Sequence, residues 1–136
     1  MSAFVKFQKF IEALAEKKHN LGSDQLKIAL SNSLPDAATA GELADITEIA
    51  YTNLSAREIA TGSSAQTSGT YKLVLDDLTL TASGNVAPFR YVILYNDTAS
   101  NNDLIAFFDY GSTISMVDTE TFKIDFDASL GILTIA

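Results

Sequence analysis

The sequence predicts a mainly β domain, an antiparallel sandwich of the jelly-roll-like kind with an amphipathic α-helix at its N-terminus. Seven or eight short segments alternate apolar and polar residues, as half-buried strands do. Polar turn residues separate these segments. The 136 residues are enough for one core, so we expect a single domain over residues 1–136. It would consist of a helix within residues 1–20 and a β-rich body over residues 24–136.

Residues 2–18 are predicted to form the amphipathic helix. The apolar residues that recur there at three- and four-residue steps, and so share one face, are Phe4, Phe7, Phe10, Ile11 and Leu14. This face could pack on the domain's own sheet, or part of it could dock on a neighbouring subunit. A terminal helix suits docking, because it can move away without breaking the core.

The first part of the body contains one clear strand and two loops. Residues 24–31 alternate and predict a half-buried strand. Turn formers and small residues predict a loop over 32–42. Residues 43–60 fit helical steps and short turns equally well, and 51–58 could be a short helix or an irregular edge strand. The polar, glycine-containing residues 61–70 predict a mobile loop or arm, and loops of this length are often functional.

Strands dominate the rest of the chain. Residues 71–81 hold two alternating runs, and Asp76-Asp77 between them predicts a β-bulge. The apolar run 89–95 predicts a central strand covered on both faces. Tyr110-Gly111 is expected to separate two strands, and residues 117–120 form a polar turn. The remaining predicted strands cover residues 104–109, 113–116, 122–126 and 132–135.

Composition excludes several classes of function. The chain has no cysteine and one histidine, His19, which excludes disulfides, thiolate catalysis and multi-histidine metal sites within one subunit. The net charge is −8, and the only basic cluster, Lys17-Lys18-His19, is too small for direct nucleic-acid binding. No apolar run approaches the roughly 20 residues that span a bilayer, and the N-terminal segment lacks the apolar stretch of a signal peptide. We therefore expect neither a membrane partner nor Sec export.

No catalytic constellation is visible. His19 is the only candidate histidine base, and no G-x-S-x-G motif is present. A glycosidase-like carboxylate pair would have to come from Asp76, Asp77, Asp109, Asp125 and Asp127. Their outward alternation and the lack of tryptophan favour a polar sheet face instead. The Asn/Asp-rich loop 96–103 offers oxygen ligands that calcium prefers, although its spacing is not that of an EF-hand. We expect a protein that is not an enzyme and needs no cofactor. The sequence alone does not decide whether the 96–103 loop binds calcium.

The strand sequences resemble a known family. The segments that carry the resemblance are QTSGTYKLVL, PFRYVILYNDT, DYGSTISM and the closing GILTIA. Together with the order of the remaining segments, they resemble small structural proteins of tailed bacteriophages, of the capsid decoration or cement type. The resemblance covers nearly the whole chain and includes no catalytic motif.

This resemblance implies a protein that binds the outer surface of the phage head, bridges major capsid protein subunits and stabilises the shell. It also implies self-association, as a dimer or trimer at a symmetry axis. The protein would be located in the virion and assembled in the bacterial host cytoplasm. A tail or head–tail connector protein is one alternative. A carbohydrate- or cell-surface-binding β module is another, and it would need an exposed aromatic platform built from Tyr91, Tyr95 and Tyr110.

Contacts with other subunits or the capsid are predicted at the helix face and in the 61–70 segment. The residues are Phe4, Phe7, Phe10, Ser63, Ser64, Gln66 and Thr67.

Overall fold

The computed structural model describes residues 3–136 and is mainly β, with antiparallel sheets and one α-helix near the N-terminus of this described part. The predicted fold class is therefore confirmed. The elements are, in order, β1 (Ala3–Lys6), α1 (Gln8–Ala15), β2 (Leu26–Ser31), the 3-10 turn η1 (Leu43–Asp45), β3 (Glu58–Ile59), β4 (Thr61–Thr67), β5 (Thr70–Leu75), β6 (Leu78–Thr81), β7 (Val86–Asn96), β8 (Leu104–Met116), β9 (Thr121–Ile124) and β10 (Leu133–Ile135).

A five-stranded antiparallel sheet forms the centre of the protein, with the strand order β1-β8-β7-β2-β3. Successive side chains of β8 point to opposite faces of this sheet. The Phe107 ring packs 5.3 Å from that of Phe7, and the Phe108 ring lies 6.2 Å from that of Phe126. Both faces are thus covered, and β7 is buried without interruption from Tyr91 to Asn96. The prediction of a central strand covered on both faces is confirmed.

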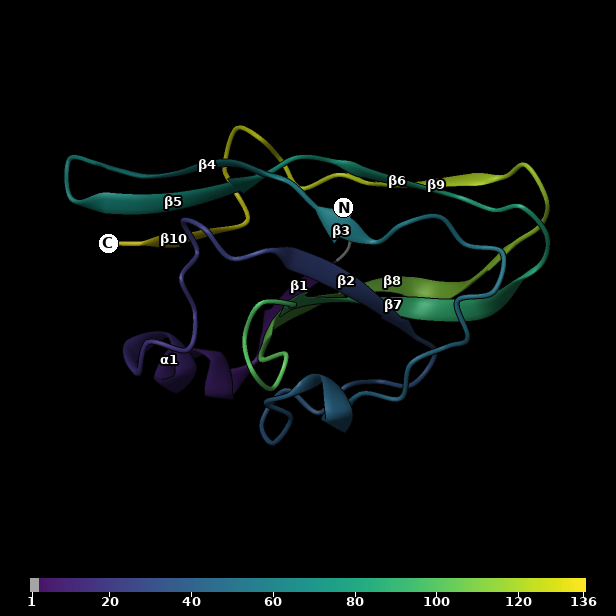
Figure 1. The fold of residues 1–136 in the computed structure, drawn as a ribbon, viewed down its shortest axis with the longest axis horizontal. Coiled ribbons are helices and arrows are strands. Elements are labelled where there is room, and N and C mark those ends of the chain that lie inside the picture. The colour runs from purple at the N-terminus through teal and green to yellow at the C-terminus, as the bar shows by residue number, and fades with distance from the viewer. Residues whose placement is uncertain (1–2) are drawn as a thin grey trace.

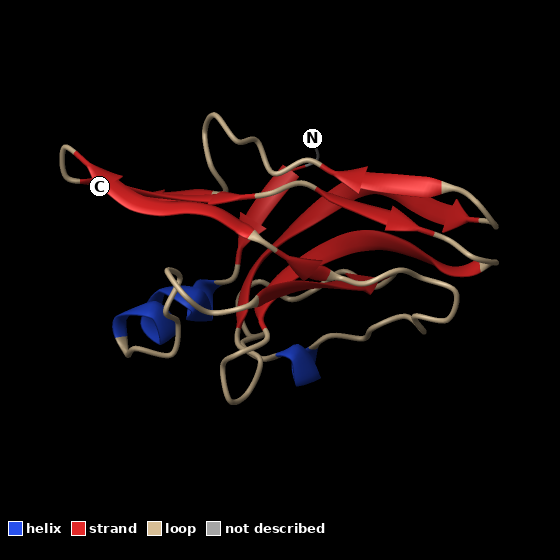
Figure 2. Cartoon of the chain, turned by 45° about the horizontal axis from the view of Figure 1, so that its top comes forward, coloured by secondary structure: helices blue, strands red, loops and turns tan. Residues whose placement is uncertain are grey.

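Two smaller sheets form a second β layer over one face of the central sheet. One has the strand order β10-β5-β4, and the other pairs β6 with β9. Figure 1 shows these strands along the top of the molecule, with α1 and η1 on the opposite side of the central sheet. Figure 2 shows the stacked strands from another angle. The layers resemble those of a sandwich.

The change from β5 to β6 is a change of sheet and not a β-bulge. The chain leaves the β10-β5-β4 sheet at Asp76-Asp77 and enters the β6-β9 sheet. Asp77 Oδ1 accepts a hydrogen bond from the Phe126 backbone N–H at 3.0 Å, which ties the break to the end of β9. Leu75 and Leu80 are both buried, so the two apolar sets face inward as the sequence predicts. The bulge prediction is wrong because the strands on the two sides have different partners.

The N-terminal helix is shorter than predicted. Ala3–Lys6 form β1, which pairs antiparallel with β8, and α1 covers only Gln8–Ala15. Phe7, in an extended conformation, separates the two and donates its N–H to the Ile105 carbonyl. The long strand β8 offers unpaired backbone groups here, and pairing with them outweighs the helical pattern. Residues 1–2, at the start of the predicted helix, lie outside the described part.

Strand β8 is likewise one element and not two. Gly111 has a φ of +80°, and β8 has extra residues opposite β7 between the pairs Tyr91↔Asp109 and Phe89↔Ile114. Glycine adopts this backbone conformation without steric cost, so the strand bulges and continues where the sequence predicts a turn.

The remaining loop predictions divide into two groups. Residues 32–42 contain no helix or strand apart from an isolated bridge at Glu42, and residues 117–120 form a turn, as predicted. The ambiguous residues 43–60 contain only η1, an isolated bridge at Leu54 and the two-residue strand β3. The loop predicted over 61–70 is wrong, because it forms β4 and the turn into β5.

Candidate interaction surface

Strands β4, β5 and β10 form an extension of the body that we call the arm. In Figure 1 the β4–β5 hairpin reaches beyond the central sheet on the left, above α1. Thr67 pairs with Thr70, so the hairpin turn consists of Ser68 and Gly69 alone, with φ values of 51° and 84°. Two positive φ values in a two-residue loop are typical of a type I′ turn, whose twist matches that of paired strands. A tight turn of this kind makes the segment a defined hairpin.

The predicted polar contact residues all lie on β4. Ser63, Gln66 and Thr67 are exposed, and Ser64 is half-buried. The Ser64 and Tyr71 hydroxyls are 2.8 Å apart and hydrogen-bonded, which links β4 to β5 through their side chains. The structure thus places these four residues together on one exposed strand.

The predicted phenylalanine contacts need a correction. Phe7 is 0% exposed and Phe10 is 3% exposed, so both belong to the core of the subunit and cannot form the contact surface. Phe4 is 41% exposed, but it lies on β1, where its ring packs 5.5 Å from that of Phe108. The part of the apolar face formed by Phe7 and Phe10 therefore serves folding, whereas Ile11 of α1 is 53% exposed.

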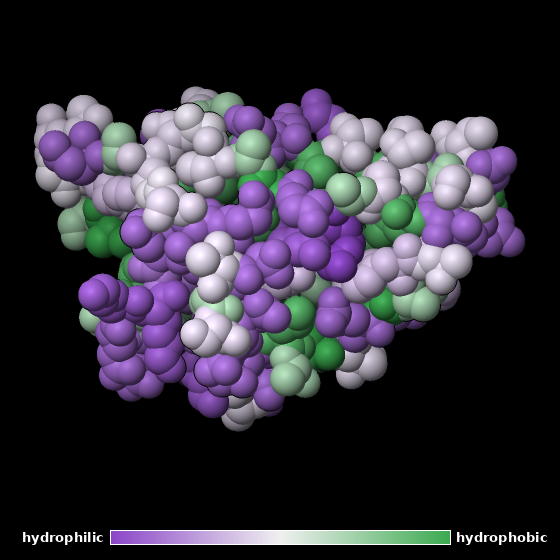
Figure 3. Space-filling model, in the orientation of Figure 1, coloured by the Kyte–Doolittle hydropathy of each residue, from purple (hydrophilic) through white to green (hydrophobic). Residues whose placement is uncertain are grey.

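A groove of about 940 Å³ lies between the arm and the C-terminal end of α1. Its apolar wall includes Leu14, Tyr71 and Ile135, and Ile135 is 45% exposed. The 98–101 loop and the residues after α1 supply a polar wall. Figure 3 shows hydrophobic residues at the left, between the arm and the hydrophilic surface of α1.

A buried polar cluster lies at the base of this groove. The Asn96 Oδ1 accepts hydrogen bonds from the backbone N–H groups of Thr98 and Ala99 at 3.0 and 3.1 Å. Its Nδ2 donates to Asp24 Oδ2 at 2.7 Å and to His19 Nδ1 at 3.0 Å. Asn96 therefore uses both amide hydrogens and holds the residues after α1 against the end of β7.

His19 is 6% exposed, and its Nε2 has no hydrogen-bond partner among residues 3–136. Burial lowers the pKa of His19, against the attraction of the Asp103 and Asp24 carboxylates, which raises it. Because Nδ1 accepts a hydrogen bond, the neutral ring carries its proton on Nε2. The cluster thus requires an uncharged His19.

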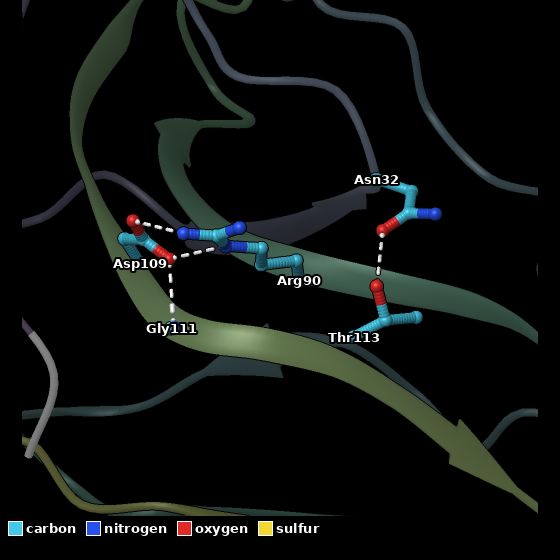
Figure 4. A network of polar contacts seen from close by, with 5 residues as sticks. All are labelled: Asn32, Arg90, Asp109, Gly111 and Thr113. Atoms are coloured by element: carbon cyan, nitrogen blue, oxygen red, sulfur yellow. Dashed lines mark hydrogen bonds and ion pairs between the residues drawn. The ribbon is translucent and has the colours of Figure 1, made fainter.

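The strand carboxylates hold turns and bulges in place. Figure 4 shows Arg90 donating to both carboxylate oxygens of Asp109, at 2.8 Å from Nε and 3.1 Å from Nη2. The Gly111 N–H also donates to Asp109 Oδ1, at 2.8 Å. These hydrogen bonds hold the pKa of Asp109 below its usual value, with Arg90 the larger cause. Across the bulge, the Thr113 hydroxyl donates to Asn32 Oδ1 at 3.3 Å, as Figure 4 also shows.

Three of the other carboxylates considered for catalysis also accept hydrogen bonds from backbone N–H groups. Asp77 accepts the Phe126 N–H, Asp125 accepts the Asp127 N–H, and Asp127 accepts two N–H groups within its own turn. The hydrogen bonds of Asp125 and Asp127 are local and stabilise turns, whereas that of Asp77 joins residues 49 positions apart in the chain. We see no pair of these groups arranged across a cleft in the described residues.

The tyrosines do not form an exposed platform. Tyr91 and Tyr95 are buried in β7, and the half-buried Tyr110 ring packs 5.0 Å from the Phe122 ring. The aromatic platform that a carbohydrate-binding module needs is therefore missing at the predicted position.

Two further features are absent from residues 3–136. In this part of the chain, no group of three or more histidine, aspartate or glutamate side chains is arranged to hold a metal ion. None of the helices found there has the length and apolar character needed to cross a membrane.

We compared the chain with models of protein families, with curated proteins and with solved structures, and none of the three comparisons found a match. The arm, the groove and the polar cluster are therefore interpreted from their own geometry.

Proposed function

We propose that the chain is a non-enzymatic structural protein of a tailed-phage virion. It acts as a cement or decoration protein that binds the outer surface of the head, bridges major capsid protein subunits and stabilises the shell. The observation that carries the proposal is the exposed arm on a rigid β body, whose outer strand β4 and hairpin turn carry no charge. Because the strand sequences resemble those of phage decoration proteins, we interpret the arm as the part of the chain that contacts the shell.

Charge supports a contact role for the arm. The chain has a net charge of −8, yet no charged residue occurs between Ile59 and Tyr71. Protein interfaces are depleted of charged residues at their centre, because burying a charge is costly. An acidic protein that leaves the outer strand and turn of a projecting hairpin free of charge has a surface suited to burial against another protein.

Rigidity supports a bridging role. The central sheet is covered on both faces, and its two longest strands, β7 and β8, pair along most of their length. A bridge between shell subunits must hold a fixed distance, which a doubly covered sheet provides. Four of the five carboxylates that could have formed a catalytic pair, namely Asp77, Asp109, Asp125 and Asp127, accept backbone N–H groups, which favours a structural role over catalysis.

Binding to shells tests the proposal. Purified chain is mixed with emptied heads of the phage that encodes it, and the heads are sedimented. We expect saturable co-sedimentation and a higher temperature of shell disassembly. Heads of an unrelated phage serve as the control. The proposal is wrong if the chain stays in the supernatant and the disassembly temperature does not change.

A further inference from the structure

We propose that the free edge of β4 pairs antiparallel with β4 of a second copy, across a twofold axis. The two three-stranded arm sheets would then join into one continuous sheet with β4 strands at its centre. This inference concerns the isolated chain and does not depend on the proposed binding to phage heads.

The outer edge of β4 is long and unpaired. Thr61–Thr67 pair only with β5, and no backbone hydrogen bond outside that ladder involves residues 61–67 among the described residues. All of β4 is exposed except the half-buried Ser64. An edge of this kind presents a row of free N–H and C=O groups, which is a template for another strand.

The other sheet edges within residues 3–136 are poorer templates. Strands β3 and β10 have two and three residues. Strand β1 has four residues and carries Lys6, and β9 carries Lys123. The edge of β6 is occupied at Thr81, whose N–H donates to Ser55 Oγ and whose carbonyl accepts the Ser55 N–H. Among the edge strands of the three sheets, β4 is therefore the longest, and it carries no charge.

Self-pairing fits the residues of β4. A twofold axis places the strand against its own sequence, so any charge near the axis would face its copy. With Ser64 at the axis, Ser64 would face its own copy and Ser63 would face Ala65, while the irregularity between Thr61 and Ser63 ends the regular register there. These are small, uncharged residues, and hydroxyl side chains in facing positions can hydrogen-bond.

Charge also selects a second copy as the occupant. Two chains of net charge −8 repel each other over most of their surfaces, and the uncharged 59–71 segment is where this repulsion is weakest. Natural edge strands are usually protected by charged residues or proline, and β4 has neither. Its position on the projecting arm also leaves room for a second hairpin alongside (Figures 1 and 2).

A cysteine scan tests the geometry directly, because the chain contains no cysteine of its own. Three variants each place one thiol near the proposed axis, namely Ser63→Cys, Ser64→Cys and Ala65→Cys. In a twofold antiparallel pair, the residue at the axis faces itself at a Cβ distance that a disulfide can bridge. Ser129→Cys, exposed in the turn before β10, is the control.

We expect at least one β4 variant to form an interchain disulfide roughly 10- to 100-fold faster than Ser129→Cys, because pairing raises the effective thiol concentration from micromolar toward millimolar. Equal rates in all four variants would overturn the proposal.

Sedimentation velocity provides a second, independent test on variants that keep the fold. Ala65→Glu places a charge diagonally across the axis from its own copy, while within the chain it faces Lys72 of β5 and so supports the hairpin. Ala128→Glu makes the same charge change in an exposed turn. We expect wild type and Ala128→Glu to dimerise with rising concentration and Ala65→Glu to remain monomeric.

A wild-type chain that stays monomeric over the same range, or an Ala65→Glu variant that dimerises normally, would show that β4 does not pair with itself. If the wild-type chain stays monomeric, the free edge of β4 remains available to a strand of another protein. Both experiments are done without phage heads, so their failure leaves the head-binding proposal to its own test.

Discussion

Lowering the pH from 7 to 5.5 should destabilise this protein through His19 alone. The Asn96 amide cannot turn over to accommodate a protonated ring, because its Oδ1 accepts two backbone N–H groups and its Nδ2 also donates to Asp24. A proton on His19 Nδ1 would therefore replace a hydrogen bond with two opposed N–H groups. Burial acts in the same direction and lowers the pKa of His19 below its ordinary value of 6.5.

The sign and the upper limit of the effect follow from proton linkage. Below pH 6.5 the unfolded chain binds a proton on His19 that the folded chain does not, so stability falls with pH until the folded pKa is reached. If His19 stays neutral in the folded state down to pH 5.5, the free energy of unfolding falls by about 1.3 kcal/mol from its value at pH 7. The chain has no second histidine, and the carboxylates with lowered pKa values titrate at lower pH.

Urea unfolding at several pH values, followed by far-UV circular dichroism, measures this loss. The single histidine also gives one assignable Cε1 proton signal in NMR, whose titration reports the folded pKa directly. His19→Gln cannot titrate, so its stability should not change over this range. The reasoning would be refuted by a wild-type stability that is equal or higher at pH 5.5, or by a folded pKa at or above 6.5.

Two further predictions concern packing and backbone geometry. Phe7→Ala should lower the free energy of unfolding by about 3–5 kcal/mol, because Phe7 is fully buried against Phe107. Phe4→Ala on the partly exposed edge strand should cost clearly less, and equal losses in urea unfolding would show that Phe7 is not in the core. Gly111→Ala should cost about 1–2 kcal/mol in the same assay, because the residue has a φ of +80°. The new methyl group would meet no atom within 4 Å, so an unchanged midpoint would show that the bulge does not need this conformation.

Strands whose apolar residues face the core were predictable from the sequence. The alternation of Leu26, Ile28 and Leu30 in β2 and the apolar run of β7 follow directly from burial on one face or on two. The segments whose secondary structure was predicted wrongly lack a clear pattern of apolar residues facing the core. In β1, residues Ala3–Lys6 belong to a pattern that also fits a helix, and only the partner strand β8 decides between the two.

The arm was hidden because β4 has almost no apolar residues to alternate. An edge strand on a projecting hairpin needs none, since neither of its faces is fully buried. The usable signal was Ser68-Gly69, a two-residue turn between segments of similar length. The four predicted polar contact residues therefore lie together on β4, although the sequence predicts a loop there.

The buried cluster could not be predicted. His19, Asp24 and Asn96 are far apart in the sequence and meet only because β7 ends beside the residues that follow α1. The sequence also could not show whether Phe7 and Phe10 are buried within the subunit or against another subunit. A helical apolar stripe indicates that its residues are buried, but it does not show which subunit covers them.

The number of copies in purified virions tests the central proposal most directly. Quantitative mass spectrometry of particles from the phage that encodes the chain gives this number relative to the major capsid protein. A cement protein that bridges shell subunits should be present in hundreds of copies per particle, in a fixed ratio to the shell protein. A handful of copies would place the chain in the tail or the head–tail connector, and its absence from the particle would contradict a virion role altogether.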